Sequence, residues 1–419
     1  MKTMAGYVVR QLADTFYILP TGQRIADRRR CLKINQTGCV IWDLLQKDLS
    51  WKELLAAYTE YVNQSVGTES KKLSEQDLIR DLSTYVQTLF QFGMIQLSDD
   101  EMQAFPFTEY NFKECCHTYF HIAGIQVYYE GRQEWLHSFL QSFSEPADEI
   151  TKKNGTQTIK NIPVQNWYVK PLSQVPEISG KMLLFGTQMD IYHCDTYYML
   201  RFPSNHHLVL CTLSFDGKEA VFYYDGATQQ EAVDELFYGV RTVFFYFAAL
   251  HGKYAIHSAS NCYKEKAWLY SAPSGTGKTT HIKLWEQLYH TAVFNGDLNL
   301  IGIEDRQAFV YGIPWCGTSG HYSTGKMPLG GIILLKRGTQ NKVCILPEDE
   351  KQLFTAQRMI SPTWTPKQND ANLLFAKELS MQIPIWRLYC TQQPSAAEVM
   401  KEAIDRYQEQ AMPVESRLD

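Results

Sequence analysis

A glycine-rich segment at residues 271–280, SAPSGTGKTT, has the residue types and spacing of a phosphate-binding loop. The pattern begins at Ala272, which stands where the first glycine is usual. Gly275 and Gly277 permit a tight turn with inward-facing N–H groups, and the start of the following helix adds a dipole that attracts phosphate. The loop therefore predicts a site for a nucleoside triphosphate. The residues expected to contact the nucleotide are Ser274, Gly275, Thr276, Gly277, Lys278, Thr279 and Thr280.

Three side chains in and after this loop could act on the phosphates. Lys278 is expected to reach the terminal phosphates, and the hydroxyl of Thr279 is expected to contact Mg²⁺. Asp297 ends the apolar run 292–297, and a carboxylate at a strand end beside a phosphate loop is well placed to hold Mg²⁺. The alternative is an Asn-Gly-Asp turn without a metal role, because these residue types are also common in turns.

Residues 311–326, YGIPWCGTSGHYSTGK, are rich in glycine and hydroxyl groups. Loops of this kind on rigid scaffolds often carry function. We expect this loop to close over the phosphates, with His321 or Lys326 supplying positive charge to the transition state. An exposed loop without that role is the alternative for these two side chains.

The surrounding pattern predicts the elements that position these residues. Residues 267–271 form an apolar run typical of a buried strand, and residues 281–289 have helical spacing, which is the strand, loop and helix order that a phosphate loop requires. A long apolar helix over 228–250 is expected to lie under a sheet. The other predicted elements are strands at 167–170, 181–187, 197–202, 207–213, 220–224 and 329–335 and helices at 370–381 and 395–410.

The first hundred residues have a pattern of their own. Predicted strands cover 7–19, 30–34 and 94–97, and predicted helices cover 36–46, 51–62 and 74–92. Ser50 and Ser74 are the expected N-caps of the second and third helices. This order of elements predicts a small winged-helix-like module, followed by an acidic linker that ends in proline.

The module resembles the PqqD family of peptide chaperones. The residues that carry this resemblance are LKINQTGCVIWDLL at 32–45 and LFQFGMI at 89–95. The resemblance implies that the module binds the leader part of a ribosomally made precursor peptide as an added strand. The groove would lie between the strand at 31–34 and the helix at 74–92. A module that only dimerises the protein or braces the rest of the chain is the alternative.

Four later motifs resemble the HPr kinase/phosphorylase-like family, whose core is similar to that of ATP-dependent phosphoenolpyruvate carboxykinases. The motifs are IH at 256–257, APSGTGKTT at 272–280, NGD at 295–297 and GIPWCG at 312–317. The resemblance implies phosphoryl transfer from ATP to a hydroxyl, with His257 near the transferred phosphate.

The chain departs from that family in two places. Family members commonly carry two adjacent Asp residues where this chain has Gly296 and Asp297, so metal binding and base catalysis both fall to Asp297. An acidic residue directly after the loop is replaced by Thr280, which argues against dual kinase and phosphorylase action on HPr itself.

Composition limits the classes of protein that remain. At 419 residues the chain should form two or three domains, and a net charge of −5 lacks the basic excess of a general nucleic-acid binder. The ten cysteines include no CxxC pair, so structural zinc is not expected. The longest apolar stretch, 243–250, is too short to span a bilayer, and we expect a reduced, cytoplasmic protein with no membrane partner.

Together these patterns predict an α+β chain. A PqqD-like leader-binding domain at 1–97 and a linker at 98–111 precede a β-rich part at 112–255 and a mixed α/β catalytic core of the HPr kinase type at 256–411. The expected activity is an ATP- and Mg²⁺-dependent kinase acting on a Ser or Thr of a captured precursor peptide. A kinase of a small hydroxylated metabolite and a non-catalytic ATP-binding chaperone are the alternatives. Relatives of this kinase type often form rings, so a homo-oligomer is a further expectation.

Overall fold

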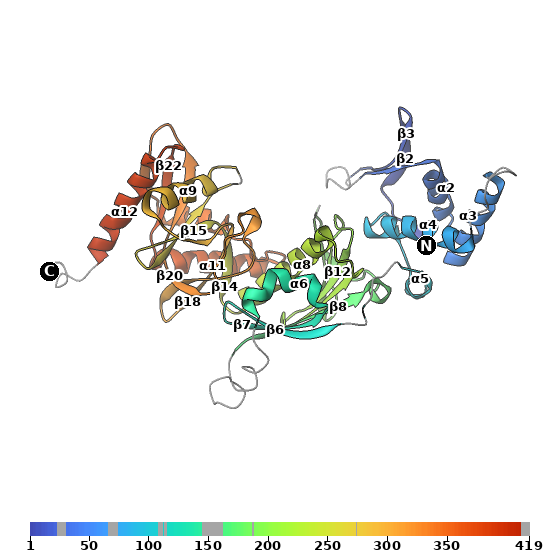
Figure 1. The fold of residues 1–419 in the computed structure, drawn as a ribbon, viewed down its shortest axis with the longest axis horizontal. Coiled ribbons are helices and arrows are strands. Elements are labelled where there is room, and N and C mark those ends of the chain that lie inside the picture. Colours follow the sequence, from blue (N-terminus) through green and yellow to red (C-terminus); the bar gives the residue numbers. More distant parts are fainter. Residues whose placement is uncertain are drawn as a thin grey trace. The chain divides into compact units, whose positions relative to one another are not determined.

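The structure is a computed structural model that describes residues 1–22, 31–65, 74–107, 112, 115–144, 162–186, 188–273 and 275–411. These residues form helices and four sheets, two of them large, which confirms the predicted α+β class (Figure 1). Contacts group the chain into two compact units. The first contains 1–118, 128–138 and 165–243, and the second contains 119–127, 139–164 and 244–419. The predicted boundaries at 97, 111 and 255 stay predictions.

The N-terminal sheet has three antiparallel strands in the order β2-β3-β4, namely β2 (Tyr7–Leu12), β3 (Thr15–Pro20) and β4 (Leu32–Ile34). The single strand predicted over 7–19 is wrong, because the chain turns at Ala13 and Leu12 pairs with Thr15. Ala13 has φ of 50°. A side chain rarely adopts that backbone conformation, so the residue type gave no signal for the turn.

Three helices follow this sheet, as predicted: α2 (Gln36–Leu45), α3 (Trp51–Ser65) and α4 (Glu75–Gln91). Ser50 and Ser74 cap the second and third of them, since their hydroxyls accept the N–H groups of Glu53 and Asp77. Strand β5 (Ile95–Gln96) then pairs with β1 (Lys2–Thr3). The predicted linker begins with a short helix, α5 (Asp99–Ala104), which Ser98 and Glu101 stabilise as a capping box.

The second sheet has eight strands in the order β6-β7-β8-β13-β12-β11-β10-β9. Strands β8 and β13 pair in parallel, and β13 pairs antiparallel with β12 on its other side. Helix α8 (Gln230–Leu250) packs on this sheet as predicted, with Gly239 against Leu208 of β12. The strands are Cys116–Ile122, Ile125–Gly131, Val164–Pro171, Lys181–Leu184, Asp190–His193, Tyr197–Arg201, Leu208–Ser214 and Glu219–Tyr224 for β6 to β13, and helix α6 is Gln133–Leu140.

The other large sheet has nine strands. Seven of them follow the order β14-β18-β19-β20-β16-β15-β17, β22 pairs with β20, and β21 pairs with β22. Its strands are Lys253–His257, Ala259–Tyr263, Lys266–Ser271, Val293–Asn295, Leu298–Glu304, Gln307–Tyr311, Lys326–Arg337, Lys342–Ile345 and Ile385–Cys390 for β14 to β22. Strands β16, β20 and β22 are mutually parallel neighbours, so their carboxyl ends lie at one edge.

Helices cover this nine-stranded sheet. The helices are α9 (Lys278–Tyr289), α10 (Glu348–Ala356), α11 (Pro366–Gln382) and α12 (Ser395–Ala411). Trp285 of α9 and Ile404 of α12 share one apolar core, while Leu379 of α11 belongs to another. Helix α9 begins at the carboxyl end of β16 and α12 follows that of β22, which brings two helix starts to the same edge. Among the described residues, no helix has both the length and the apolar character needed to cross a membrane.

Candidate nucleotide site

The predicted phosphate loop joins β16 to α9, and its glycines adopt the backbone that the motif needs. Gly275 has φ of 74° and Gly277 has φ of 117°. A Cβ atom added to either would meet no atom within 4 Å, so the space in front of both is open. Gly277 is the N-cap of α9 and offers no side-chain cap, which leaves the first amides of the helix to a ligand. Ser274 lies outside the described residues.

Below the loop, Lys278 folds back onto His257. Lys278 Nζ lies 2.8 Å from His257 Nε2 and also donates to the Ala272 carbonyl oxygen at 3.2 Å. An ammonium group can only donate, so Nε2 of His257 is the acceptor and its ring proton sits on Nδ1. That nitrogen lies 3.5 Å from Asp297 Oδ1. The structure thus brings together the three residues predicted as catalytic.

The charges of this cluster depend on one another. Burial, and then the positive charge of Lys278, hold the pKa of His257 below its ordinary value, while Asp297 raises it. Burial also lowers the pKa of Lys278, again against the effect of Asp297. Arg358 adds positive charge near both groups and lowers both pKa values. His257 is therefore neutral near pH 7, and the site combines two cations with one carboxylate.

Backbone pairing fixes the cluster. The N–H of Ser258 donates to the Asp297 carbonyl oxygen at 2.9 Å, and the N–H of His257 donates to the Arg358 carbonyl oxygen at 2.9 Å. Asn295 is fully buried; its Oδ1 accepts the amide of Asp297 at 3.2 Å, and its Nδ2 donates to the Ile313 carbonyl oxygen at 3.1 Å. Asn295 thereby sets the turn that presents Asp297.

Gly296, which stands where the resembled family has an acidic residue, faces Ser319. A Cβ atom added at Gly296 would lie 1.9 Å from Ser319 Oγ and 2.4 Å from Ser319 Cβ. That serine is held by its own bond to the Cys316 carbonyl oxygen at 2.6 Å. The turn at residues 317–319 therefore fills the volume that a second carboxylate would need.

We expect Gly296→Asp to destabilise the protein by about 1–3 kcal/mol, because the new side chain overpacks against Ser319. Adding Ser319→Gly should restore most of that loss, since it empties the contested volume. The coupling free energy between positions 296 and 319 is measured by urea unfolding of the wild type, both single variants and the double variant. A Gly296→Asp variant as stable as the wild type would show that this contact does not exclude a carboxylate.

His321 and Lys326 of the glycine-rich stretch lie in different surroundings. The His321 carbonyl oxygen accepts the amide of Gly296 at 3.0 Å, so its backbone borders the turn that carries Asp297, while the side chain is exposed. Lys326 pairs with Glu304 and lies 3.9 Å over the Phe309 ring. Its ammonium group is thus already engaged, and a phosphate role for either residue stays a prediction.

Two arginines at the site were not predicted. Arg337, the last residue of β20, donates from Nη2 to the Gly275 carbonyl oxygen at 2.6 Å. Arg358 precedes Met359, which pairs with Ile256 of β14. A basic residue at the carboxyl end of a strand parallel to β16 is a signal that could have identified Arg337, since such strand ends meet at one edge. The sequence holds no comparable signal for Arg358.

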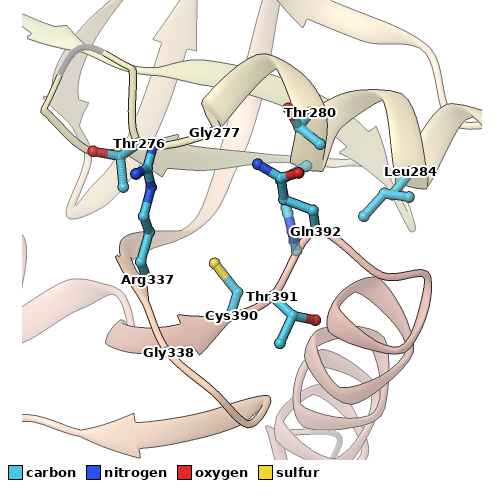
Figure 2. A pocket seen from close by; sticks show the side chains of 10 residues that line it. Thr276, Gly277, Thr280, Leu284, Arg337, Gly338, Cys390, Thr391 and Gln392 are labelled. Carbon is cyan, nitrogen blue, oxygen red and sulfur yellow. The ribbon is translucent and has the colours of Figure 1, made fainter.

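A cavity of about 160 Å³ adjoins the loop (Figure 2). It lies between the start of α9, the end of β20 and the segment after β22. Figure 2 shows Arg337 extending toward Thr276 and the Gln392 amide directed toward α9. The lining residues are Thr276, Gly277, Thr280, His281, Leu284, Arg337, Gly338, Cys390, Thr391 and Gln392.

His281, in the wall of this cavity, is almost fully buried. Its Nε2 accepts the indole N–H of Trp285 at 3.2 Å, and its ring centroid lies 4.7 Å from that of Tyr270. Burial lowers the pKa of His281 to about 4 from 6.5. Between these values the unfolded chain binds a proton that the folded chain does not, so this contribution to stability is complete above pH 6.5 and falls with falling pH.

Because of His281, we expect the unfolding free energy of the wild type to fall by about 3 kcal/mol when the pH is lowered from 7 to 4. In His281→Gln that part of the pH dependence should disappear, because the amide can accept from Trp285 without titrating. Urea unfolding at several pH values measures the slope. His290→Asn, at the exposed C-terminal end of α9, is the control and should keep the wild-type slope. Equal slopes in wild type and His281→Gln would contradict the assignment.

Within the described ranges, no group of three or more His, Cys, Asp or Glu side chains is arranged to hold a metal ion.

No protein-family profile matches the chain, and no curated protein matches it. Among solved structures, the chain is similar to the HPr(Ser) kinase/phosphatase from Coxiella burnetii, at 8% sequence identity and a TM-score of 0.22, over 38% of this chain and 96% of that one. A likeness at this score carries no argument, so the function must be inferred from the site itself.

Proposed function

We propose that this chain is an ATP-dependent phosphotransferase that moves the γ-phosphoryl group to a Ser or Thr hydroxyl of a precursor peptide. One observation carries the proposal: Lys278, neutral His257 and Asp297 form a connected chain of contacts beneath an open glycine loop. Phosphoryl transfer asks for positioned positive charge and for a carboxylate that orients and finally accepts the hydroxyl proton. Those are the groups that this cluster provides.

The residues present fit a triphosphate with Mg²⁺. The uncapped start of α9 and the open faces of Gly275 and Gly277 suit phosphate oxygens, and Lys278 supplies a cation beside them. Mg²⁺ usually keeps several waters and takes only one or two protein oxygens together with phosphate. Thr279 and Asp297 would be those oxygens, and the metal would neutralise charge on the phosphates when bound.

The peptide part of the proposal rests on a groove in the N-terminal module. A hollow of about 540 Å³ lies along α4 and α2, and its wall includes Gly38, Ile41, Thr84 and Tyr85. The Tyr85 hydroxyl donates to the Gly38 carbonyl oxygen at 3.2 Å and so joins the two helices. Strand β4 is an edge strand of its sheet, and an edge offers unpaired backbone groups to an added peptide strand.

Capture by such a groove would raise the acceptor concentration at the catalytic cluster. Binding of the leader makes the second encounter intramolecular, with an effective concentration of about millimolar for a short flexible linker. This gives a physical reason for one chain to carry both a peptide groove and a phosphate loop. It also predicts that the groove changes KM for the peptide more than it changes the chemical step.

The direct test is to incubate the full chain with ATP, Mg²⁺ and the short precursor peptide encoded beside its gene. Mass spectrometry should show one added phosphate on a Ser or Thr of the peptide. Phosphorylation of a sugar or other metabolite, with none on the peptide, would reject the peptide part and leave the kinase. ATP binding without acceptor-dependent ADP release would reject the kinase and favour a chaperone.

A groove variant tests capture separately. Thr84→Trp fills the hollow from an exposed position of α4 and should raise the peptide KM by about 100-fold, within the gain that tethering supplies, with little change in kcat at saturating peptide. Gln76→Trp, exposed on the same helix and outside the hollow, is the matched control and should behave as the wild type. An unchanged KM in Thr84→Trp would show that this groove does not bind the peptide.

A further inference from the structure

We infer that a second pocket along α4 binds the cationic side chain of an Arg or Lys in the captured peptide, an inference that rests on the proposed function. This acidic pocket measures about 330 Å³ and lies between α4, the turn before β12 and the start of α8. All of its lining residues belong to the first compact unit. They are Thr84, Gln87, Thr88, Gln91, His206, His207, Asp225 and Glu231.

The acidic pocket adjoins the groove proposed for the leader. Thr84 and Thr88 line both the groove of about 540 Å³ and the acidic pocket, so the two spaces meet on the same side of α4. Gln91 follows Thr88 at a spacing of three residues, which places all three side chains on one face of the helix. A peptide held in the groove would therefore reach the acidic pocket by extending along this face.

The charges of the lining favour a cation. Two lining residues, Asp225 and Glu231, are carboxylates, and none of the eight is Lys or Arg. His207 Nδ1 lies 2.7 Å from Asp225 Oδ2. Burial lowers the pKa of His207, but the bond to Asp225 and the charges of three carboxylates outweigh it and raise this pKa above its ordinary value. The carboxylates thus dominate the potential in the pocket, and a positive ligand is stabilised there.

Gln91 adds a polar group that faces the pocket. Only 7% of this residue is exposed, yet it forms part of the lining. Among the described residues, none forms a hydrogen bond with its side-chain amide. Buried amides are usually hydrogen-bonded, so this one points to a ligand that completes its bonds. The amide oxygen, like the two carboxylates, can accept from an ammonium or guanidinium group.

The turn that carries the two histidines is held in place from both sides. The carboxylate oxygens of Glu235 accept the backbone N–H groups of three successive residues, 206–208, at 2.7–3.0 Å. The ring of His206 packs edge-on against that of Phe92, with the centroids 4.9 Å apart. The walls of the acidic pocket are therefore fixed before a ligand arrives, which lowers the entropic cost of binding.

NMR titration of the full chain with N-acetyl-arginine amide tests this inference, with the ring protons of His206 and His207 as reporters. We expect saturable shifts with this probe and none with N-acetyl-citrulline amide, which has a similar shape but no charge. Glu231→Gln, at an exposed side chain, should weaken binding of the arginine derivative at least about fivefold, because a charge-assisted hydrogen bond is lost. Glu219→Gln, exposed at the far end of β13 from Asp225, is the matched control and should bind as the wild type does.

Binding of the precursor peptide separates this inference from the proposed function. Fluorescence anisotropy compares the peptide with versions in which each Lys or Arg in turn is replaced by Gln. One replacement should weaken binding to the wild type at least about fivefold and have little further effect on binding to Glu231→Gln. A peptide whose binding no replacement changes, or an arginine derivative that causes no shift, would overturn the inference and leave the proposed function standing. If the arginine derivative binds and the peptide does not, peptide capture and this inference fail together.

Discussion

Replacing Lys278 by alanine is expected to reduce phosphoryl transfer by about 100- to 1,000-fold, the usual effect of removing one preorganised donor from a transition state. The ammonium group is half-buried and aimed at His257 and Ala272 under the loop. Water cannot replace a cation held in that position. Affinity for ATP should fall as well, because the loop amides alone would then neutralise the phosphates.

The same variant has a second readout that does not depend on turnover. Since Lys278 lowers the pKa of His257 and Asp297 raises it, Lys278→Ala should raise the pKa of His257, measured by NMR titration of its ring protons. Lys283→Ala, exposed on the same helix, is the matched control and should change neither quantity. Full activity with an unshifted His257 would show that Lys278 does not belong to the cluster.

Local patterns predicted much of the fold. The strand before the phosphate loop, the helix after it and the three N-terminal helices were predicted because apolar spacing and Ser50 and Ser74 caps are encoded over a few residues. The hairpin turn at Ala13 was missed because its positive φ has no residue signal. Strand β22 (Ile385–Cys390) was missed because it forms by pairing with β20, which is distant in the sequence. Helix α10 (Glu348–Ala356) was missed because it packs against α11, which comes later in the sequence.

The candidate site likewise contains residues that local patterns predicted and residues that depend on pairing between distant segments. Motif spacing predicted Lys278 and Asp297, and the resemblance to the HPr kinase family implied His257. Arg337, Arg358 and the segment at 390–392 reach the site through sheet pairing instead. No local pattern states that Leu334 lies beside both Ser271 and Arg387, and that register is what brings the ends of β16, β20 and β22 together. The reason for Gly296 was equally hidden, because it depends on Ser319.

Asp297→Asn is expected to lower turnover by about 1,000-fold while leaving the fold intact. The change keeps the shape of the side chain and the backbone bond from Ser258, and removes the charge that would hold Mg²⁺ and accept a proton. Binding of ATP without metal should not weaken, because a negative charge near the phosphates is gone. The pKa of His257 should fall further, opposite in sign to its change in Lys278→Ala. Asp370→Asn, exposed on α11, is the control.

Comparing Asp297→Asn with the wild type also tests whether the Asp297 carboxylate serves both in metal binding and in accepting the proton. Gly296 lies against Ser319, and the chain has no second carboxylate at that position. If Asp297 both holds the metal and accepts the proton, Asp297→Asn should lose turnover and the Mg²⁺-dependent gain in ATP affinity together. Loss of turnover with the Mg²⁺ gain preserved would assign Asp297 to proton transfer alone, and wild-type turnover would remove it from the mechanism.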